Sequence, residues 1–252
     1  MDRFNLYAKY YDLLYEDKDY KSEVSYIEQL IEPYGFKKPI EILELGCGTG
    51  NHAKLFSEKG YSVEGVDLSS QMIEIAKHKN KGDDNLSFYE GDINSYRSDK
   101  KFDVVTSLFH VVSYQNTNEK LEETFKTAAH HLKTGGLFIF DFWYGPGVLT
   151  DPPVVREKKL ENDAILVNRK ATPESDGVQN VIKVLFDIAI KDKSTDKEEL
   201  IKETHVMRYL FIPELKYMLD KNGLDTQDYY HWMTFEKPTN SSWNVVVVAK
   251  KR

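Results

Sequence analysis

A glycine-rich turn at residues 46–50 constrains the fold of this chain more than any other feature of its sequence. The apolar segment Ile42–Leu45 runs directly into Gly46, Gly48 and Gly50. Glycine has no Cβ atom, so the backbone can turn tightly there and approach a ligand closely. In a doubly wound α/β domain, such a turn lies at the carboxyl end of the first strand, where nucleotide-like ligands bind. The turn therefore predicts an α/β domain with a ligand site at this position.

The residues around the turn indicate the charge of its ligand. A second apolar segment, Tyr61–Val66, ends on Asp67, whose carboxylate suits the two hydroxyls of a ribose. The dinucleotide fingerprint requires a third glycine where Asn51 stands. Residues 42–52 contain no lysine or arginine to bind a phosphate, and the acidic Glu44 precedes the first glycine. The pattern favours a cationic ribose ligand, and S-adenosylmethionine (SAM) has a sulfonium, an ammonium and no phosphate.

These motifs resemble the cofactor core of the class I SAM-dependent methyltransferases. The sequence ELGCGTG at 44–50 is followed by VDLSSQM at 66–72, EGDI at 90–93, FDVV at 102–105 and LKTGGL at 132–137. The order and spacing are those of the family, and the resemblance covers roughly residues 40–142. It implies a methyltransferase that uses SAM and releases S-adenosylhomocysteine.

The resemblance also assigns cofactor contacts to residues beyond the turn. Asp92 is expected to accept a hydrogen bond from the adenine amino group, and Ile93 to lie beside the ring. Met72 is either a core residue or a contact of the adenine face, and its position relative to Asp67 favours the contact. The complete predicted cofactor set is Glu44, Gly46, Gly48, Gly50, Asp67, Leu68, Met72, Asp92 and Ile93.

Composition narrows the class of protein. The 252 residues carry a formal net charge of −7, whereas nucleic-acid methyltransferases normally present a basic face, so no nucleic-acid partner is expected. No run of about eighteen apolar residues occurs, which argues against a membrane span. One cysteine, Cys47, excludes an intramolecular disulfide, and the N-terminus lacks the apolar core of a signal peptide; both favour the cytoplasm. No cysteine or histidine spacing resembles a metal site.

Apolar strands alternate with helical segments over the first half of the chain. This alternation predicts a Rossmann-like, doubly wound, mostly parallel sheet with right-handed crossovers. Two further strands, at 224–232 and 243–249, bring the expected sheet to seven strands, and the resemblance places the last one antiparallel at the edge. The N-terminal helices and the SAM-binding core are expected at residues 1–145.

Residues 146–211 leave the alternating pattern. Stretches at 164–171, 178–191 and 199–211 read as antiparallel strands separated by turn-rich breaks. We expect this β insertion to cover the methyl-acceptor site, and residues 212–252 to return to the core.

Methyl transfer requires an acceptor held in line with the sulfonium, and a base matters more for a hydroxyl than for a neutral amine. His110 and Tyr114 follow the predicted strand 102–108, where class I enzymes place groups that contact the acceptor. His110 is either a hydrogen-bonded structural histidine or a group that faces the acceptor. Tyr11 either packs in an aromatic stripe or places its ring near the sulfonium, where a cation–π contact would be favourable. These three residues are the catalytic candidates.

The identity of the acceptor rests on a narrower resemblance. Tyr11-Asp12 in the first helix and the aromatic-Gly-Pro exit at 143–146 are similar to small methyltransferases of deoxysugar biosynthesis, including N,N-dimethyltransferases of nucleotide-linked aminosugars. Those relatives carry a histidine where Tyr114 stands, so N- and O-methylation both stay open. The substrate-binding candidates are Trp143, Tyr144, Arg208 and His231, with Arg208 suited to a pyrophosphate. Related sugar enzymes are often dimers, so a homodimer is possible.

Other functions are compatible with parts of this pattern. Within the methyltransferases, the acceptor could instead be a small amine such as glycine or a polyamine. An NAD-dependent oxidoreductase is disfavoured by Asn51 and Glu44. A SAM-binding protein without catalytic activity has no sequence feature in its favour.

Overall fold

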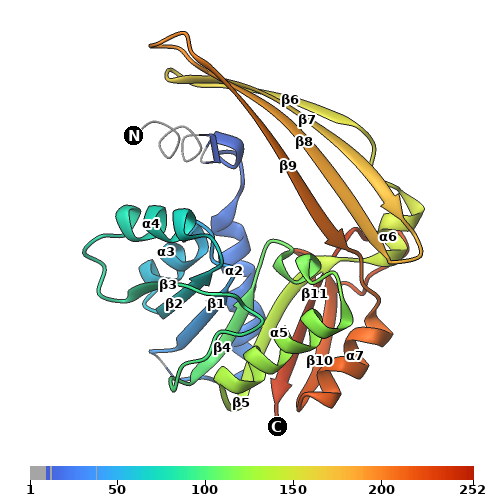
Figure 1. The fold of residues 1–252 in the computed structure, drawn as a ribbon. Coiled ribbons are helices and arrows are strands. Elements are labelled where there is room, and N and C mark those ends of the chain that lie inside the picture. The colour runs from blue at the N-terminus through green and yellow to red at the C-terminus, as the bar shows by residue number, and fades with distance from the viewer. Residues whose placement is uncertain (1–9, 12, 38) are drawn as a thin grey trace. The chain divides into compact units, whose positions relative to one another are not determined.

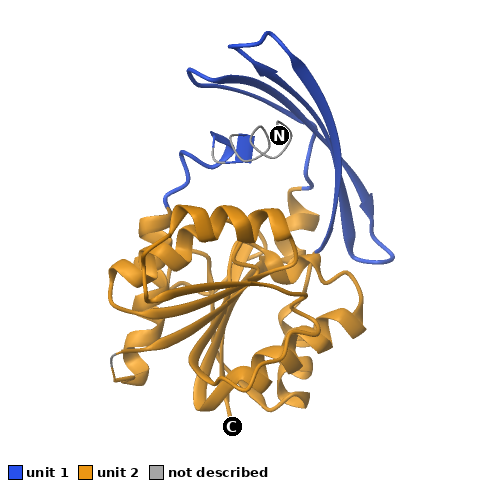
Figure 2. Cartoon of the chain, turned by 60° about the vertical axis from the view of Figure 1, so that its left-hand side comes forward, with its two compact units in different colours: residues 1–19, 152–208 blue, residues 20–151, 209–252 orange. Residues whose placement is uncertain are grey.

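The computed structural model describes residues 10–11, 13–37 and 39–252. The chain divides into two compact units, one made of Met1–Asp19 and Pro152–Arg208 and the other of Tyr20–Asp151 and Tyr209–Arg252 (Figure 2). The N-terminal residues thus group with the β insertion, whereas the sequence pattern placed them with the SAM-binding core. Asp12 of the Tyr-Asp pair lies outside the described residues.

The larger unit is built on a seven-stranded sheet with the order β10-β11-β5-β4-β1-β2-β3 (Figure 1). The strands are β1 (Glu41–Leu45), β2 (Ser62–Asp67), β3 (Leu86–Glu90), β4 (Phe102–Ser107), β5 (Leu132–Trp143), β10 (Leu224–His231) and β11 (Asn244–Lys251). Strands β1 to β5 are parallel to one another, and β11 is antiparallel to both β5 and β10. The predicted doubly wound fold is confirmed. The expected edge position of the last strand is wrong, because β11 lies between β5 and the edge strand β10.

Helices cover both faces of this sheet because its strands are apolar on both sides. The helical segments of this unit are α2 (Tyr20–Ile31), η1 (Glu32–Tyr34), α3 (Asn51–Glu58), α4 (Ser70–Lys79), η2 (Val111–Tyr114), α5 (Asn118–His131), α6 (Gly145–Thr150) and α7 (Ile212–Lys221). Buried residues of α2, α3 and α4 pack in one core cluster and those of α5 and α7 in another, with alternate residues of the strands facing each (Figure 1). No described helix has the length and apolar content needed to cross a bilayer.

The smaller unit contains a four-stranded antiparallel sheet in the order β6-β7-β8-β9. Its strands are β6 (Arg156–Glu161), β7 (Ile165–Asp176), β8 (Val181–Asp192) and β9 (Glu198–Arg208). The sequence analysis predicted only three strands. Strand β6 was missed because its residues are mostly charged and exposed, a composition that suits an edge strand.

Strand β7 also extends beyond its predicted end at residue 171. Pro173, read from the sequence as part of a turn, pairs with Val184 of β8. The pairing of β7 with β6 ends at Ala171. No residue of β6 therefore lies opposite Pro173, and a backbone N–H is not needed there to pair with β6. Proline is tolerated at such a free edge because its missing N–H removes no hydrogen bond.

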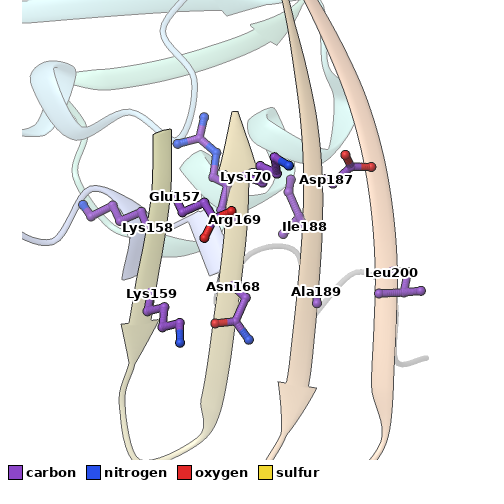
Figure 3. Close-up of a pocket in the computed structure, with 10 residues that line it drawn as sticks. All are labelled: Glu157, Lys158, Lys159, Asn168, Arg169, Lys170, Asp187, Ile188, Ala189 and Leu200. Atoms are coloured by element: carbon purple, nitrogen blue, oxygen red, sulfur yellow. The ribbon is translucent and has the colours of Figure 1, made fainter. Parts of the chain in front are cut away.

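The two faces of this sheet differ in character. One face carries Ile165, Val167, Ile188 and Ile190, which are buried in a cluster with Tyr10, Leu13 and Leu14 of the N-terminal segment. Residues on the other face alternate with these along each strand. A pocket on the sheet is lined by residues of all four strands, including four cations and two carboxylates (Figure 3): Lys158, Lys159, Arg169, Lys170, Glu157 and Asp187.

The short helix α6 packs so closely on the core that Gly147 cannot carry a side chain. A Cβ atom there would lie 2.0 Å from the carbonyl oxygen of Ser242. We expect Gly147→Ala to destabilise the fold by about 3 kcal/mol, the range of an overpacked core. Urea denaturation checks this through a lower midpoint with an unchanged slope. Gly177→Ala is the matched control, because nothing lies within 4 Å of its added Cβ; equal midpoints for the two variants would refute the packing argument.

Candidate active site

The glycine turn joins the end of β1 to the start of α3. The backbone N–H groups of Gly46 and Cys47 donate to the carbonyl oxygen of Val66 on β2, at 2.7 and 3.0 Å. Gly46 has a φ of 81°, and a Cβ atom on it would lie 2.6 Å from the side chain of Val111. The turn is therefore held against β2 in a left-handed conformation that leaves no room for a larger residue.

Asp67 at the end of β2 connects the turn to the next helix. Its Oδ2 accepts a hydrogen bond from the N–H of Gly48 and its Oδ1 accepts one from the N–H of Ser69, both at 2.9 Å. Burial raises the pKa of Asp67, and these two hydrogen bonds act in the opposite direction. Each carboxylate oxygen can accept a further hydrogen bond. The arrangement fits a pair of ribose hydroxyls.

Glu44 is buried, with 1% of its surface exposed. Its Oε1 lies 3.5 Å from Nδ1 of His52, while its Oε2 has no hydrogen-bond partner among the described residues. A buried carboxylate oxygen without a partner is costly. An ammonium group at this position would satisfy it, which fits the amino group of SAM.

The other predicted cofactor residues follow the carboxyl ends of β2 and β3. Met72 is half-buried in the first turn of α4, where its N–H donates to the N-cap side chain of Ser69. Ile93 is buried, and Asp92 is exposed, with Oδ1 accepting two hydrogen bonds from Asn94. Leu68 is 70% exposed. These residues lie along the same sheet edge as Gly46 and Asp67 because the strands are parallel and adjacent.

His110 follows β4 and faces a buried carboxylate. Its Nδ1 lies 2.6 Å from Oδ2 of Asp141 on the neighbouring strand β5, an ion-pair distance whose angle is not that of a linear hydrogen bond. The backbone N–H of His110 donates to both oxygens of Asp141 at 3.2 Å. Asp141 is fully buried, and the His110 side chain is 18% exposed. Because Nδ1 of His110 faces Asp141, the second ring nitrogen, Nε2, points away from the carboxylate.

The backbone at this point is strained. Phe109 and His110 have φ values of 66° and 63°, a left-handed conformation that costs about 1–3 kcal/mol for each non-glycine residue and is concentrated at functional sites. Aromatic rings surround the histidine: its ring centroid lies 5.5 Å from that of Phe109 and 6.4 Å from that of Trp143, and Trp143 lies 5.2 Å from Trp243. The site therefore combines an imidazole next to a buried carboxylate with several aromatic side chains.

The remaining predicted site residues are placed less centrally. Tyr114 is 42% exposed at the end of η2. Tyr144 is half-buried at the N-cap of α6, next to Trp143. His231 ends β10, three strands from β4 or about 14 Å along the sheet. Two predicted residues belong to the smaller unit. The ring centroid of Tyr11 lies 4.9 Å from that of Tyr15, and Arg208 is buried at the end of β9.

Sequence reasoning missed Asp141 and Trp243. Asp141 is the only charged residue in the apolar run 136–148. Buried charges need a partner, so an aspartate in a central strand was a usable signal. Trp243 carried no comparable signal, because its contact with Trp143 depends on the pairing of β11 with β5.

Comparisons with known proteins agree with this geometry. The family described as "Methyltransferase domain" matches residues 42–136, from β1 to the start of β5. The dTDP-3-amino-3,4,6-trideoxy-alpha-D-glucopyranose N,N-dimethyltransferase of Streptomyces venezuelae is 29% identical over 185 residues, which are 73% of this chain and 76% of that protein.

Two solved structures have the same fold along their whole length. A SAM-dependent methyltransferase from Clostridium acetobutylicum has a TM-score of 0.82 at 23% identity and covers 98% of each chain. DesVI from Streptomyces venezuelae has a TM-score of 0.80 at 23% identity and covers 100% of this chain and 99% of its own. The sheet order, the glycine turn with its two carboxylates and these comparisons lead to one conclusion: residues 42–136 belong to the family described as "Methyltransferase domain", and the chain has the fold of the two solved structures.

Proposed function

We propose that the enzyme transfers methyl groups to the amino group of a nucleotide-linked aminosugar. The observation that carries the proposal is the pairing of His110 with the buried Asp141 after β4. The relative from Streptomyces venezuelae is named as an N,N-dimethyltransferase of a dTDP-aminosugar, which supports the choice of acceptor.

The proposed cofactor contacts begin with the two carboxylates beside the glycine turn, those of Glu44 and Asp67. SAM supplies an electrophilic methyl group on a sulfonium when it is bound. In the proposed arrangement, Asp67 accepts hydrogen bonds from the ribose hydroxyls, and the free oxygen of Glu44 accepts one from the ammonium. Asp92 and Ile93 contact the adenine, with Met72 on its face. The glycine turn allows the backbone to approach the ligand.

His110 has the chemistry of a proton acceptor. A sugar amine is mostly protonated at neutral pH and must lose a proton before it can act as a nucleophile. With Nδ1 directed to Asp141, the imidazole presents Nε2 as a base, and the carboxylate stabilises the imidazolium that forms. The backbone N–H of His110, which donates to both oxygens of Asp141, keeps the residue beside this carboxylate.

The aromatic residues beside His110 suit the acceptor itself. Trp143 is held in place because its backbone N–H donates to Oγ of Ser113 at 2.9 Å, and Nε1 of Trp243 donates to the carbonyl oxygen of Asp151 at 3.0 Å. Rigid aromatic rings orient an acceptor and exclude water from the reacting centre. We propose that these two rings contact the sugar.

The test is a product assay on purified enzyme with SAM. The dTDP-linked aminosugar is compared with the free aminosugar, with the dTDP-sugar that has a hydroxyl in place of the amine, and with glycine and spermidine. Mass spectrometry is expected to detect one or two added methyl groups on the dTDP-aminosugar alone. Methylation of the hydroxyl sugar would establish an O-methyltransferase instead, and methylation of glycine or spermidine would overturn the sugar acceptor.

A further inference from the structure

A buried histidine lies between two glutamates beneath the glycine turn. His52, the second residue of α3, places Nε2 at 2.7 Å from Oε2 of Glu23 on α2 and Nδ1 at 3.5 Å from Oε1 of Glu44 on β1. The His52 side chain is only 7% exposed, and the ring of Tyr20 meets it edge-on at 4.9 Å. Residues of α2, β1 and α3 therefore meet at this imidazole.

Protonation of the histidine offsets one of the two carboxylate charges of this cluster. Burial acts to lower the pKa of His52, but its contacts with Glu23 and Glu44 outweigh burial and raise the pKa above the ordinary value. The imidazolium has two N–H donors, one for each carboxylate. Two glutamates and one imidazolium leave a net charge of −1 in this cluster, and Oε2 of Glu44 has no hydrogen-bond partner among the described residues.

We propose that His52 is a positioning residue that holds Glu44 in the orientation in which its free oxygen binds the ammonium of SAM. The inference rests on the cofactor role proposed above for Glu44. The Nδ1 contact fixes one carboxylate oxygen, so the other faces the ligand without loss of side-chain freedom on binding. The Nε2 contact with Glu23 anchors the imidazole itself.

Two conservative variants separate the two contacts of His52. In His52→Asn the amide nitrogen takes about the place of Nδ1, so a donor toward Glu44 is kept. In His52→Gln the amide nitrogen takes about the place of Nε2, so only the donor toward Glu23 is kept. Both variants lose the charge and one contact, which makes each the matched control of the other.

The readout is a ratio of two affinities measured by calorimetry. SAM carries the ammonium, whereas 5′-methylthioadenosine has the same adenosine and a thioether but no amino-acid part. We expect His52→Gln to weaken the binding of SAM by about tenfold, the effect of losing a hydrogen bond to a charged group. The affinity for 5′-methylthioadenosine should change less than twofold. His52→Asn is expected to keep the ratio of the two affinities near that of the unchanged enzyme.

Control variants distinguish this inference from general damage. Ser57→Ala removes a buried hydroxyl on the same helix, which donates to Asp83 at 2.7 Å, and should leave the ratio unchanged. The positioning role would be overturned if His52→Gln and His52→Asn gave equal ratios of the two affinities. It would also be overturned if His52→Gln weakened the binding of both ligands equally. Glu44→Gln must also lower the ratio of the SAM affinity to the 5′-methylthioadenosine affinity. If it does not, the cofactor role of Glu44 fails together with the inference. If Glu44→Gln lowers the ratio and His52→Gln leaves it unchanged, only the inference fails.

Discussion

Replacing His110 by glutamine is expected to lower kcat/KM for the aminosugar by about 10²–10³-fold, the usual contribution of a positioned general base. Glutamine keeps a polar group of similar size but cannot accept a full proton from the ammonium. Affinity for SAM should stay within twofold, because the predicted cofactor contacts lie after β1, β2 and β3. Steady-state kinetics with calorimetric SAM titration measures both quantities.

Asp141→Asn tests the partner of His110. The amide preserves the shape of the buried carboxylate but removes the charge that stabilises an imidazolium, so kcat should fall by a similar factor without a change in Kd for SAM. His78→Gln is the control, because His78 is exposed near the end of α4. If His110→Gln retained full activity, the amine would reach the site already neutral and the histidine would be structural.

Asp67→Asn is expected to weaken SAM binding about 100-fold. Each hydrogen bond to a charged group contributes about 1.5–3 kcal/mol, and the substitution affects two proposed bonds to the ribose. It also places an amide N–H₂ against a backbone donor, either Gly48 or Ser69, since both oxygens of Asp67 already accept hydrogen bonds from the turn. Calorimetry measures the loss.

The matched control for this variant is Asp84→Asn, an exposed aspartate between α4 and β3. It makes the same chemical change without touching the turn. 5′-Methylthioadenosine retains the ribose, so its affinity for Asp67→Asn should fall as much as that of SAM. A normal affinity of Asp67→Asn for both ligands would show that the ribose is bound by other residues.

Much of the cofactor site could be predicted from the sequence because its parts are local. Gly46, Gly48 and Gly50 follow one strand, and Asp67 ends the next. Parallel strands that are adjacent in the sheet bring their carboxyl ends together. Each of these residues therefore reaches the candidate site through the strand that precedes it.

The histidine contacts could not be predicted in the same way. Asp141 is 31 residues from His110, and Glu23 and Glu44 are 29 and 8 residues from His52. Which side chain meets which depends on the side-by-side packing of β4 with β5 and of α2 with α3. A sequence pattern indicates that a charge is buried but does not name the residue that neutralises it.

The sequence by itself determined the class of fold, the position of the glycine turn and the carboxylates at the ends of the first two strands, because apolar periodicity and glycine geometry act over a few residues. Only the tertiary structure decided the partners of His110 and His52, the edge strand β6, and the grouping of the N-terminal residues with the β insertion. These features arise from contacts between distant segments, whose free energy depends on burial in the folded chain.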